Sequence, residues 1–228
     1  MGFWVLLAAL VVNLALALVI LTRATRASST AYFGISALFI ALWAFGTLLM
    51  LFGATENTVR IGVLLFLIAP ILTTLYMALF SKYFSGIDFP KKYQAVGIFS
   101  GIAAIFAVVT LYLLPETTVV LAINGWAGNE LNFQHAWYWV YGAYFIVMFM
   151  VSYLYLLAGV TQSRGRIHKQ RRLVLFGIFA TSFLALFTNV LLPIFGNTDL
   201  LWAGPALTIL YVVTTSYAMV KHGLFDLR

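Results

Sequence analysis

Few residues in this chain could take part in acid–base, nucleophilic or metal chemistry. It has no cysteine, and its three histidines (His135, His168 and His222) fall in three different linkers between apolar segments. The sequence contains no phosphate-binding loop, no HExxH zinc motif, no GxSxG nucleophile motif and no acid pair at catalytic spacing. We therefore predict no enzymatic activity, no catalytic residue, no metal site and no cofactor.

The residues that could bind a small molecule are aromatic and amide side chains near one end of the apolar segments. Four aromatic residues lie together in the stretch WYWVY, and a further tryptophan lies in the preceding linker. Such side chains form an aromatic belt at a membrane interface, or they line a ligand pocket that has a few polar contacts. The candidate ligand-binding residues are Asn124, Trp126, Glu130, Trp137, Trp139, Tyr141, Asn189, Asn197 and Trp202.

Membrane helices must position these residues. Hydrophobic residues make up 64% of the 228 residues and charged residues 8%, whereas a soluble domain carries about a quarter charged residues. Seven apolar segments are each long enough to cross about 30 Å of hydrocarbon as a helix. The sequence thus predicts an all-α integral membrane protein, a single seven-transmembrane-helix bundle over residues 1–228. Its helices lie at about 3–22, 31–53, 59–81, 94–114, 136–160, 173–195 and 200–221, with an outer loop at 115–135.

The distribution of charge predicts the orientation. Twelve of the 13 basic residues lie after the first, third and fifth segments or in the C-terminal tail, and Arg60 is the exception. The positive-inside rule makes that side cytoplasmic, so the N-terminus is outside and the C-terminus inside the plasma membrane. Anionic lipid accounts for the net charge of +7 without nucleic acid. The densest basic run, SRGRIHKQRR, fits a topology anchor beside lipid or a site for an acidic partner.

Two pairs of segments suggest an internal repeat. Residues 33–53 and 176–196 both begin with FGI, both end with FG, and agree at eight of 21 positions. The segments that follow contain PILTTLY and PALTILY, which agree at five of seven positions. The pattern predicts a 3+1+3 parallel repeat with the fourth helix as its linker, and shared apolar composition is the alternative.

The outer loop and the polar residues within the spans add further expectations. TTVVLAI, NGWAGN and ELNFQHA follow one another as a strand, a turn and a return strand would, which predicts a small extracytoplasmic β-hairpin between helices 4 and 5. We expect this hairpin to cap the candidate pocket. Asn13 and Asn189 are predicted to hydrogen-bond between helices. Pro70, Pro193 and Pro205 interrupt backbone hydrogen bonds and predict hinges or kinks.

The whole pattern resembles the seven-helix N-terminal sensor region of prokaryotic histidine kinases. The resemblance rests on the order of spans, the outer loop, the entry RGRIHKQRRLVLFGIF and the terminal YAMVKHGLFDLR. It implies a sensor that perceives an extracytoplasmic or membrane-dissolved ligand and relays it through the seventh helix to a cytoplasmic kinase or regulator. The implied signal-coupling residues are Lys221, His222, Leu224, Phe225 and Asp226, although Lys221 and His222 also suit a helix end at the headgroups.

The pattern leaves other readings open. No phosphoacceptor or nucleotide-binding domain precedes Arg228, so we expect either a stand-alone sensor or the membrane part of a longer chain. The main alternative is a small-solute transporter resembling the SWEET family, with the repeat-matched Thr73 and Thr208 near the midplane and Tyr76 and Tyr211 one turn on. A structural subunit of a larger complex is a third reading. The small residues of GIFSG suit a homodimer or close packing within the bundle.

Overall fold

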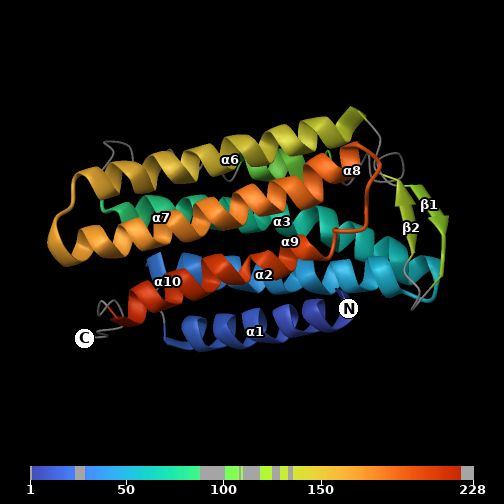
Figure 1. Ribbon diagram of the computed structural model, residues 1–228, viewed down its shortest axis with the longest axis horizontal. Helices are drawn as coiled ribbons and strands as arrows, with labels where there is room; N and C mark the ends of the chain where they lie inside the picture. The colour runs from blue at the N-terminus through green and yellow to red at the C-terminus, as the bar shows by residue number, and fades with distance from the viewer. Residues whose placement is uncertain are drawn as a thin grey trace.

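The structure, a computed structural model, describes residues 2–23, 29–87, 101–107, 109, 119–124, 129–132 and 136–221. Long helices lie side by side along the longest axis of the molecule (Figure 1). Five of the described helices are long and apolar enough to cross a membrane. Of the predicted fourth span, residues 101–107 and 109 are described, and they are helical. The helical elements are α1 (Gly2–Arg23), α2 (Ser29–Phe52), α3 (Glu56–Ser85), α6 (Ala136–Thr161), α7 (Gly165–Leu186), the π-helix η2 (Phe187–Leu191), α8 (Leu192–Ile194), α9 (Ala203–Leu207) and α10 (Ile209–Lys221).

Helix α3 extends beyond the predicted 59–81 at both ends because both ends are capped. The Thr55 hydroxyl accepts a hydrogen bond from the Thr58 N–H at 3.3 Å, and the acidic Glu56 lies in the first turn. At the other end Gly86 adopts a left-handed conformation with φ 63° and donates its N–H to the Tyr83 carbonyl. The cap residues lie outside the apolar stretch from which the span was predicted.

Helix α7 begins at Gly165, whereas the sequence predicted a span from residue 173. The basic run therefore lies mostly on the first turns of a helix and not in a linker. Its residue Arg171 donates to the Gly159 carbonyl near the end of α6 at 2.9 Å, which ties the two helix ends together. Charged residues end a hydrophobic stretch, but they do not end a helix that continues into the polar headgroup region.

The last two spans are interrupted helices. A π-turn, η2, follows α7, and Pro193 comes directly after it in α8. The predicted seventh helix, 200–221, is divided into α9 and α10 by a turn at Thr208, three residues after Pro205. Neither α9 nor α10 alone is long enough to cross a bilayer. In Figure 1 they follow each other along the length of the bundle.

Two short strands lie at the end of the bundle opposite the end of α10 (Figure 1). Strands β1 (Val119–Ala122) and β2 (Glu130–Asn132) pair antiparallel, with Val119 opposite Asn132 and a register shift between Val120 and Ala122. Asn129 fastens this segment to the end of α2. Its backbone N–H donates to the Leu51 carbonyl at 2.8 Å, and its side-chain amide donates to the Met50 and Gly53 carbonyls at 3.0 and 3.1 Å.

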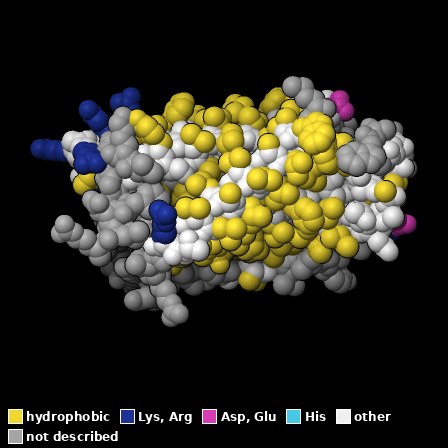
Figure 2. Space-filling model, turned by 90° about the horizontal axis from the view of Figure 1, so that it is seen from below, with side chains coloured by type: hydrophobic (Ala, Val, Ile, Leu, Met, Phe, Trp, Pro, Cys, Tyr) yellow, Lys and Arg dark blue, Asp and Glu magenta, His cyan; other side chains and the backbone are white. Residues whose placement is uncertain are grey.

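The core of the bundle is the contact between α2 and α3. Of the five long helices α3 is the most buried and α1 the least. A Cβ atom at Gly62 would lie 2.2 Å from the Met50 nitrogen, and one at Gly46 would lie 2.8 Å from the Phe66 nitrogen, so the two backbones nearly touch. The surface in Figure 2 is mostly hydrophobic along its middle, with basic side chains at one end and acidic ones at the other.

Candidate functional site

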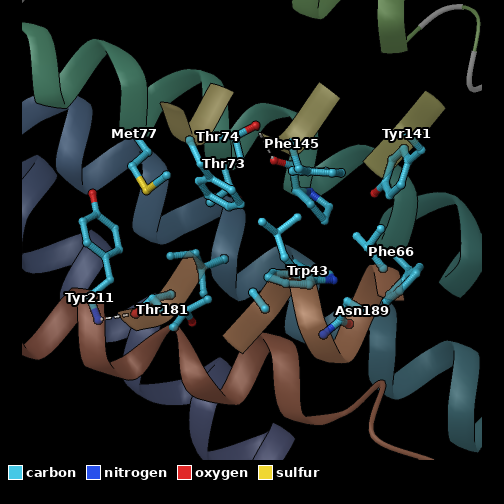
Figure 3. Close-up of a pocket in the computed structure, with 17 residues that line it drawn as sticks. Trp43, Phe66, Thr73, Thr74, Met77, Tyr141, Phe145, Thr181, Asn189 and Tyr211 are labelled. Carbon is cyan, nitrogen blue, oxygen red and sulfur yellow. Dashed lines mark hydrogen bonds between the residues drawn. The ribbon is translucent and has the colours of Figure 1, made fainter. Parts of the chain in front are cut away.

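A cavity lies inside the bundle, where α2, α3, α6, the α7–η2 segment and the α9–α10 segment meet (Figure 3). None of its described lining residues carries a charge. Its aromatic walls are Trp43, Phe66, Tyr141, Phe145, Phe149 and Tyr211, and its polar residues other than these are Thr73, Thr74, Thr181, Asn189 and Thr208.

The threonines of the lining use their hydroxyls on nearby backbone carbonyls. Thr73 donates to the Ala69 carbonyl at 2.9 Å, and Thr74 donates to the Pro70 and Ile71 carbonyls at 3.1 and 3.0 Å. A threonine on a membrane helix satisfies its hydroxyl in this way when no solvent is near. The α3 side of the cavity, which also includes Phe66, Pro70 and Met77, is therefore mainly apolar.

Tyrosines of α6 donate to backbone carbonyls near two of the prolines, Pro70 and Pro193. Pro70 has no N–H to offer the Phe66 carbonyl, and next to it the Tyr141 hydroxyl donates to the Leu67 carbonyl at 2.9 Å. About one turn away on α6, the Tyr138 hydroxyl donates to the Asn189 carbonyl at 2.5 Å. Pro193, four residues after Asn189, has no N–H to donate to this carbonyl. These bonds fasten α6 to α3 and to η2.

The Asn189 side chain joins η2 to the start of α9. With its amide oriented by the surrounding hydrogen bonds, it donates to the Leu201 carbonyl at 3.0 Å and accepts from the Gly204 N–H at 3.1 Å. A Cβ at Gly204 would lie 1.7 Å from this amide, so only glycine leaves room for it. The predicted hydrogen bond between segments is confirmed for Asn189. Asn13, in contrast, donates to the Ala9 carbonyl of its own helix at 2.7 Å.

A ladder of contacts joins α7 to the last span. The Thr181 hydroxyl accepts from the Tyr211 N–H at 3.0 Å and donates to the Leu207 carbonyl at 3.4 Å, on either side of the break at Thr208. Towards the basic end, the two backbones approach closely at Gly177, where a Cβ would lie 2.9 Å from the Thr214 Cβ. Still further along, Gln170 donates to the Ala218 carbonyl at 3.2 Å.

Tyr211 also joins the last span to α2. Its hydroxyl lies 3.1 Å from the Ser36 hydroxyl, and its ring meets that of Phe33 edge to face at 5.4 Å between centroids. Tyr211 is 1% exposed, so this hydrogen bond is shielded from solvent. A single residue of α10 therefore touches the cavity, α2 and α7 at once.

The structure brings two of the nine predicted ligand-binding residues, Tyr141 and Asn189, to the cavity. The expected pocket at the outer loop is not where the described cavity lies. Trp139 is 57% exposed on the outer surface of α6, and Trp202 packs against Gly2 of α1.

The other predicted residues lie away from the cavity or outside the described part of the chain. Asn197 is exposed and accepts a hydrogen bond from the Asp199 N–H, and Asn124 is exposed and donates its N–H to the Asn129 side chain. Trp126 lies outside the described residues, as do the side chains of Glu130 and Trp137. The predicted coupling residues beyond Lys221, which are His222, Leu224, Phe225 and Asp226, also lie outside them.

Sequence reasoning missed the residues that form the middle of the cavity. Trp43 and Thr181 were not singled out, and Thr73, Thr208 and Tyr211 were considered only as transporter residues. A lone tryptophan in an apolar helix looks the same in sequence whether it faces lipid or a cavity. The repeated motif around Pro70 and Pro205 was the available signal, because prolines of both motifs lie beside the cavity-lining threonines.

Comparison with known proteins gives one family. The model of the family described as the N-terminal 7TM region of histidine kinase matches residues 5–228, almost the entire chain. No significant match was found among curated proteins or among solved structures. The match and the apolar helices together make this a multi-pass membrane protein. They give no support to the transporter alternative.

Proposed function

Because this chain belongs to the family of N-terminal 7TM regions of histidine kinases, we propose that it senses a small molecule bound in the intramembrane cavity. In this proposal the last span relays occupancy of the cavity to a cytoplasmic kinase or regulator. The observation that carries the proposal is the position of α10, which lines the cavity with Tyr211 and ends at Lys221 beside the basic run of α7.

A ligand changes the state of such a bundle only if it binds one arrangement of helices better than another. The cavity is suited to this requirement because five helical segments share its wall. Interrupted helices also move more readily than continuous ones, and both η2 and the break at Thr208 lie on the wall. Filling the cavity would therefore act directly on the two interrupted spans.

The ladder between α7 and α10 gives the signal a physical route. Thr181 holds the break at Thr208, and Gln170 holds the last turns of α10 near Ala218. A shift of Tyr211 is therefore carried along α10 to its end at Lys221. The segment that follows, with His222, Leu224, Phe225 and Asp226, is our candidate coupling segment to the partner.

The proposed orientation places the end of α10 in the cytoplasm. Its support is the gathering of Arg166, Lys169 and Arg172 on the first turns of α7, at the same end of the bundle as Arg23. The described exception, Arg60, lies at the other end and pairs with Glu56 at 2.7 Å. Anionic lipid attracts the first group to the cytoplasmic leaflet.

The proposal predicts that filling the cavity moves α10. Ala185 is buried in the cavity wall, and Ala185→Phe introduces a ring there in place of a ligand. The chain has no native cysteine, so one spin label can be attached at Gln162 and a second at Tyr217 of the same molecule. Both positions are exposed. We expect the distance between these labels in lipid nanodiscs to change by about 1–2 Å, the usual size of a helix shift in switching.

Leu157→Phe is the matched control, because it adds a ring on the lipid-facing side of α6, where Leu157 is 50% exposed. It should leave the distance distribution as in the wild type. If Ala185→Phe folds, as judged by its thermal unfolding, and gives the wild-type distribution, then the cavity is not coupled to α10 and the proposed function is wrong.

A further inference from the structure

We infer that the cavity binds an uncharged, mainly apolar molecule that carries one hydrogen-bond acceptor, and that the indole N–H of Trp43 donates to this acceptor. The inference rests on the proposed function, since it names the class of ligand for the same cavity. The ligand class follows from one buried donor without a partner, in a wall whose other described polar atoms each have one.

Trp43 is a cavity-lining residue that is 6% exposed, and Figure 3 shows its ring among the lining side chains. Its Nε1 is buried and has no hydrogen-bond partner within the described part of the chain. Indole is a donor only, so this N–H cannot be satisfied by offering a lone pair to a neighbour. A buried N–H without a partner is costly in free energy, and native structures rarely tolerate one without a function.

The remaining polar groups of the wall already have partners. Their hydroxyl and amide groups bond backbone carbonyls or, for Tyr211, the Ser36 hydroxyl, and this leaves Trp43 Nε1 as the one polar side-chain atom without a partner among the described lining residues. The lining groups with assigned partners are Thr73, Thr74, Tyr141, Thr181, Thr208, Tyr211 and Asn189.

The charge of the wall restricts the ligand further. No acidic or basic residue is among the residues that the structure shows lining the cavity, so an ionised ligand would lose its hydration and gain no counter-charge from them. Apolar contact with Phe66, Phe145 and Phe149 instead favours a ring or a hydrocarbon chain. A carbonyl, ether or ester oxygen on such a molecule would supply the acceptor that Trp43 lacks.

The test compares two probes that differ only in the acceptor: benzophenone, which has a ketone oxygen, and diphenylmethane, which lacks it. Binding is measured by thermal stabilisation of the chain in lipid nanodiscs, at matched probe concentrations in the lipid. We expect the wild type to bind benzophenone roughly fivefold more tightly than diphenylmethane, as one net hydrogen bond gives. Trp43→Phe keeps an aromatic ring and removes the donor, so it should abolish this preference and still bind diphenylmethane.

Two further variants keep the test decisive. Ala185→Phe fills the cavity and should abolish binding of both probes. Trp4→Phe changes a residue that is 71% exposed on α1, so it should leave the binding of both probes as in the wild type. Photolysis of bound benzophenone should label residues of the cavity wall. Equal binding of the two probes by the wild type, a preference that survives Trp43→Phe, or failure of benzophenone to bind would each overturn the inference. Binding as expected without any movement of α10 would instead refute the proposed function and leave the ligand class standing.

Discussion

Prolines and polar side chains are matched at the scale of single residues. Each proline within a membrane span removes one backbone donor, and lipid offers no replacement. Tyr138 serves the carbonyl that Pro193 cannot reach, and Asn189 serves the Leu201 carbonyl four residues before Pro205. Tyr138 and Asn189 therefore supply the donors that two of the three span prolines lack.

This matching predicts the effect of removing one hydroxyl. Tyr138→Phe leaves the Asn189 carbonyl without this donor and should lower the free energy of unfolding by about 1 kcal/mol, the usual worth of a hydrogen bond between membrane helices. The measurement is denaturant unfolding in mixed micelles. Tyr76→Phe is the control, since no hydrogen bond of its hydroxyl is found among the described residues. A loss for Tyr138→Phe no larger than that of the control would contradict the matching.

Single residues were the least predictable level from sequence. Tyr141 and Asn189 were predicted as ligand-binding residues because an aromatic next to the interface and an amide within a span are conspicuous, and both lie on the cavity wall. Trp43 was not, because its role depends on which face of α2 meets the cavity, and α2 is apolar on all faces. Asn129, which fastens the outer segment to the end of α2, was missed because an asparagine in a turn stretch needs no further explanation.

At the scale of helices, close backbone contact joins α2 to α3. Gly46 and Gly62 face the partner backbone at neighbouring levels of the same interface, and α3 is the most buried of the long helices. Small residues let van der Waals contacts form between membrane helices, where hydrophobic burial gives no driving force. We expect α2 and α3 to be the rigid half of the bundle, against which the interrupted spans move.

Gly62→Ala tests this rigid contact. Its new methyl group would lie 2.2 Å from the Met50 nitrogen, and a backbone atom cannot rotate away, so we expect a loss of about 1–3 kcal/mol in the free energy of unfolding. Gly101→Ala is the control, because no described atom lies within 4 Å of its added Cβ. Both variants are measured in the same micelle assay. Equal stability of the two variants would show that the helices can separate without cost.

The helices themselves were predictable from the sequence, and their ends and breaks were less so. Apolar length and the absence of charge located α1, α2, α3 and α6 to within a few residues, because each must cover the hydrocarbon layer. The ends of α3 depend on caps at Thr55 and Gly86, and the start of α7 lies among basic residues in the headgroup region. The π-turn of η2, which contains Asn189, has no signal in the apolar pattern of the sequence.

At the scale of the whole molecule, charge separates the two ends of the bundle. Figure 2 shows basic side chains at one end, acidic ones at the other and a hydrophobic surface between them. The sequence predicted this separation from the linkers alone, because the alternation of spans puts every second linker on the same side.

The proposed 3+1+3 repeat remains a prediction from the sequence. Its matched motifs differ in backbone, since α3 continues through Pro70 whereas the last span breaks after Pro205.

Orientation in the membrane can be tested directly because the chain has no cysteine. Asn57→Cys lies at the start of α3 and Gln162→Cys just after α6, both exposed and at opposite ends of the bundle. If the basic end is cytoplasmic, a membrane-impermeant maleimide added to intact cells should label Asn57→Cys and leave Gln162→Cys unlabelled until the cells are permeabilised. The wild type, which cannot react, controls for background. The reverse pattern would put Lys221 outside the cell, and α10 could then not deliver a signal to a cytoplasmic kinase.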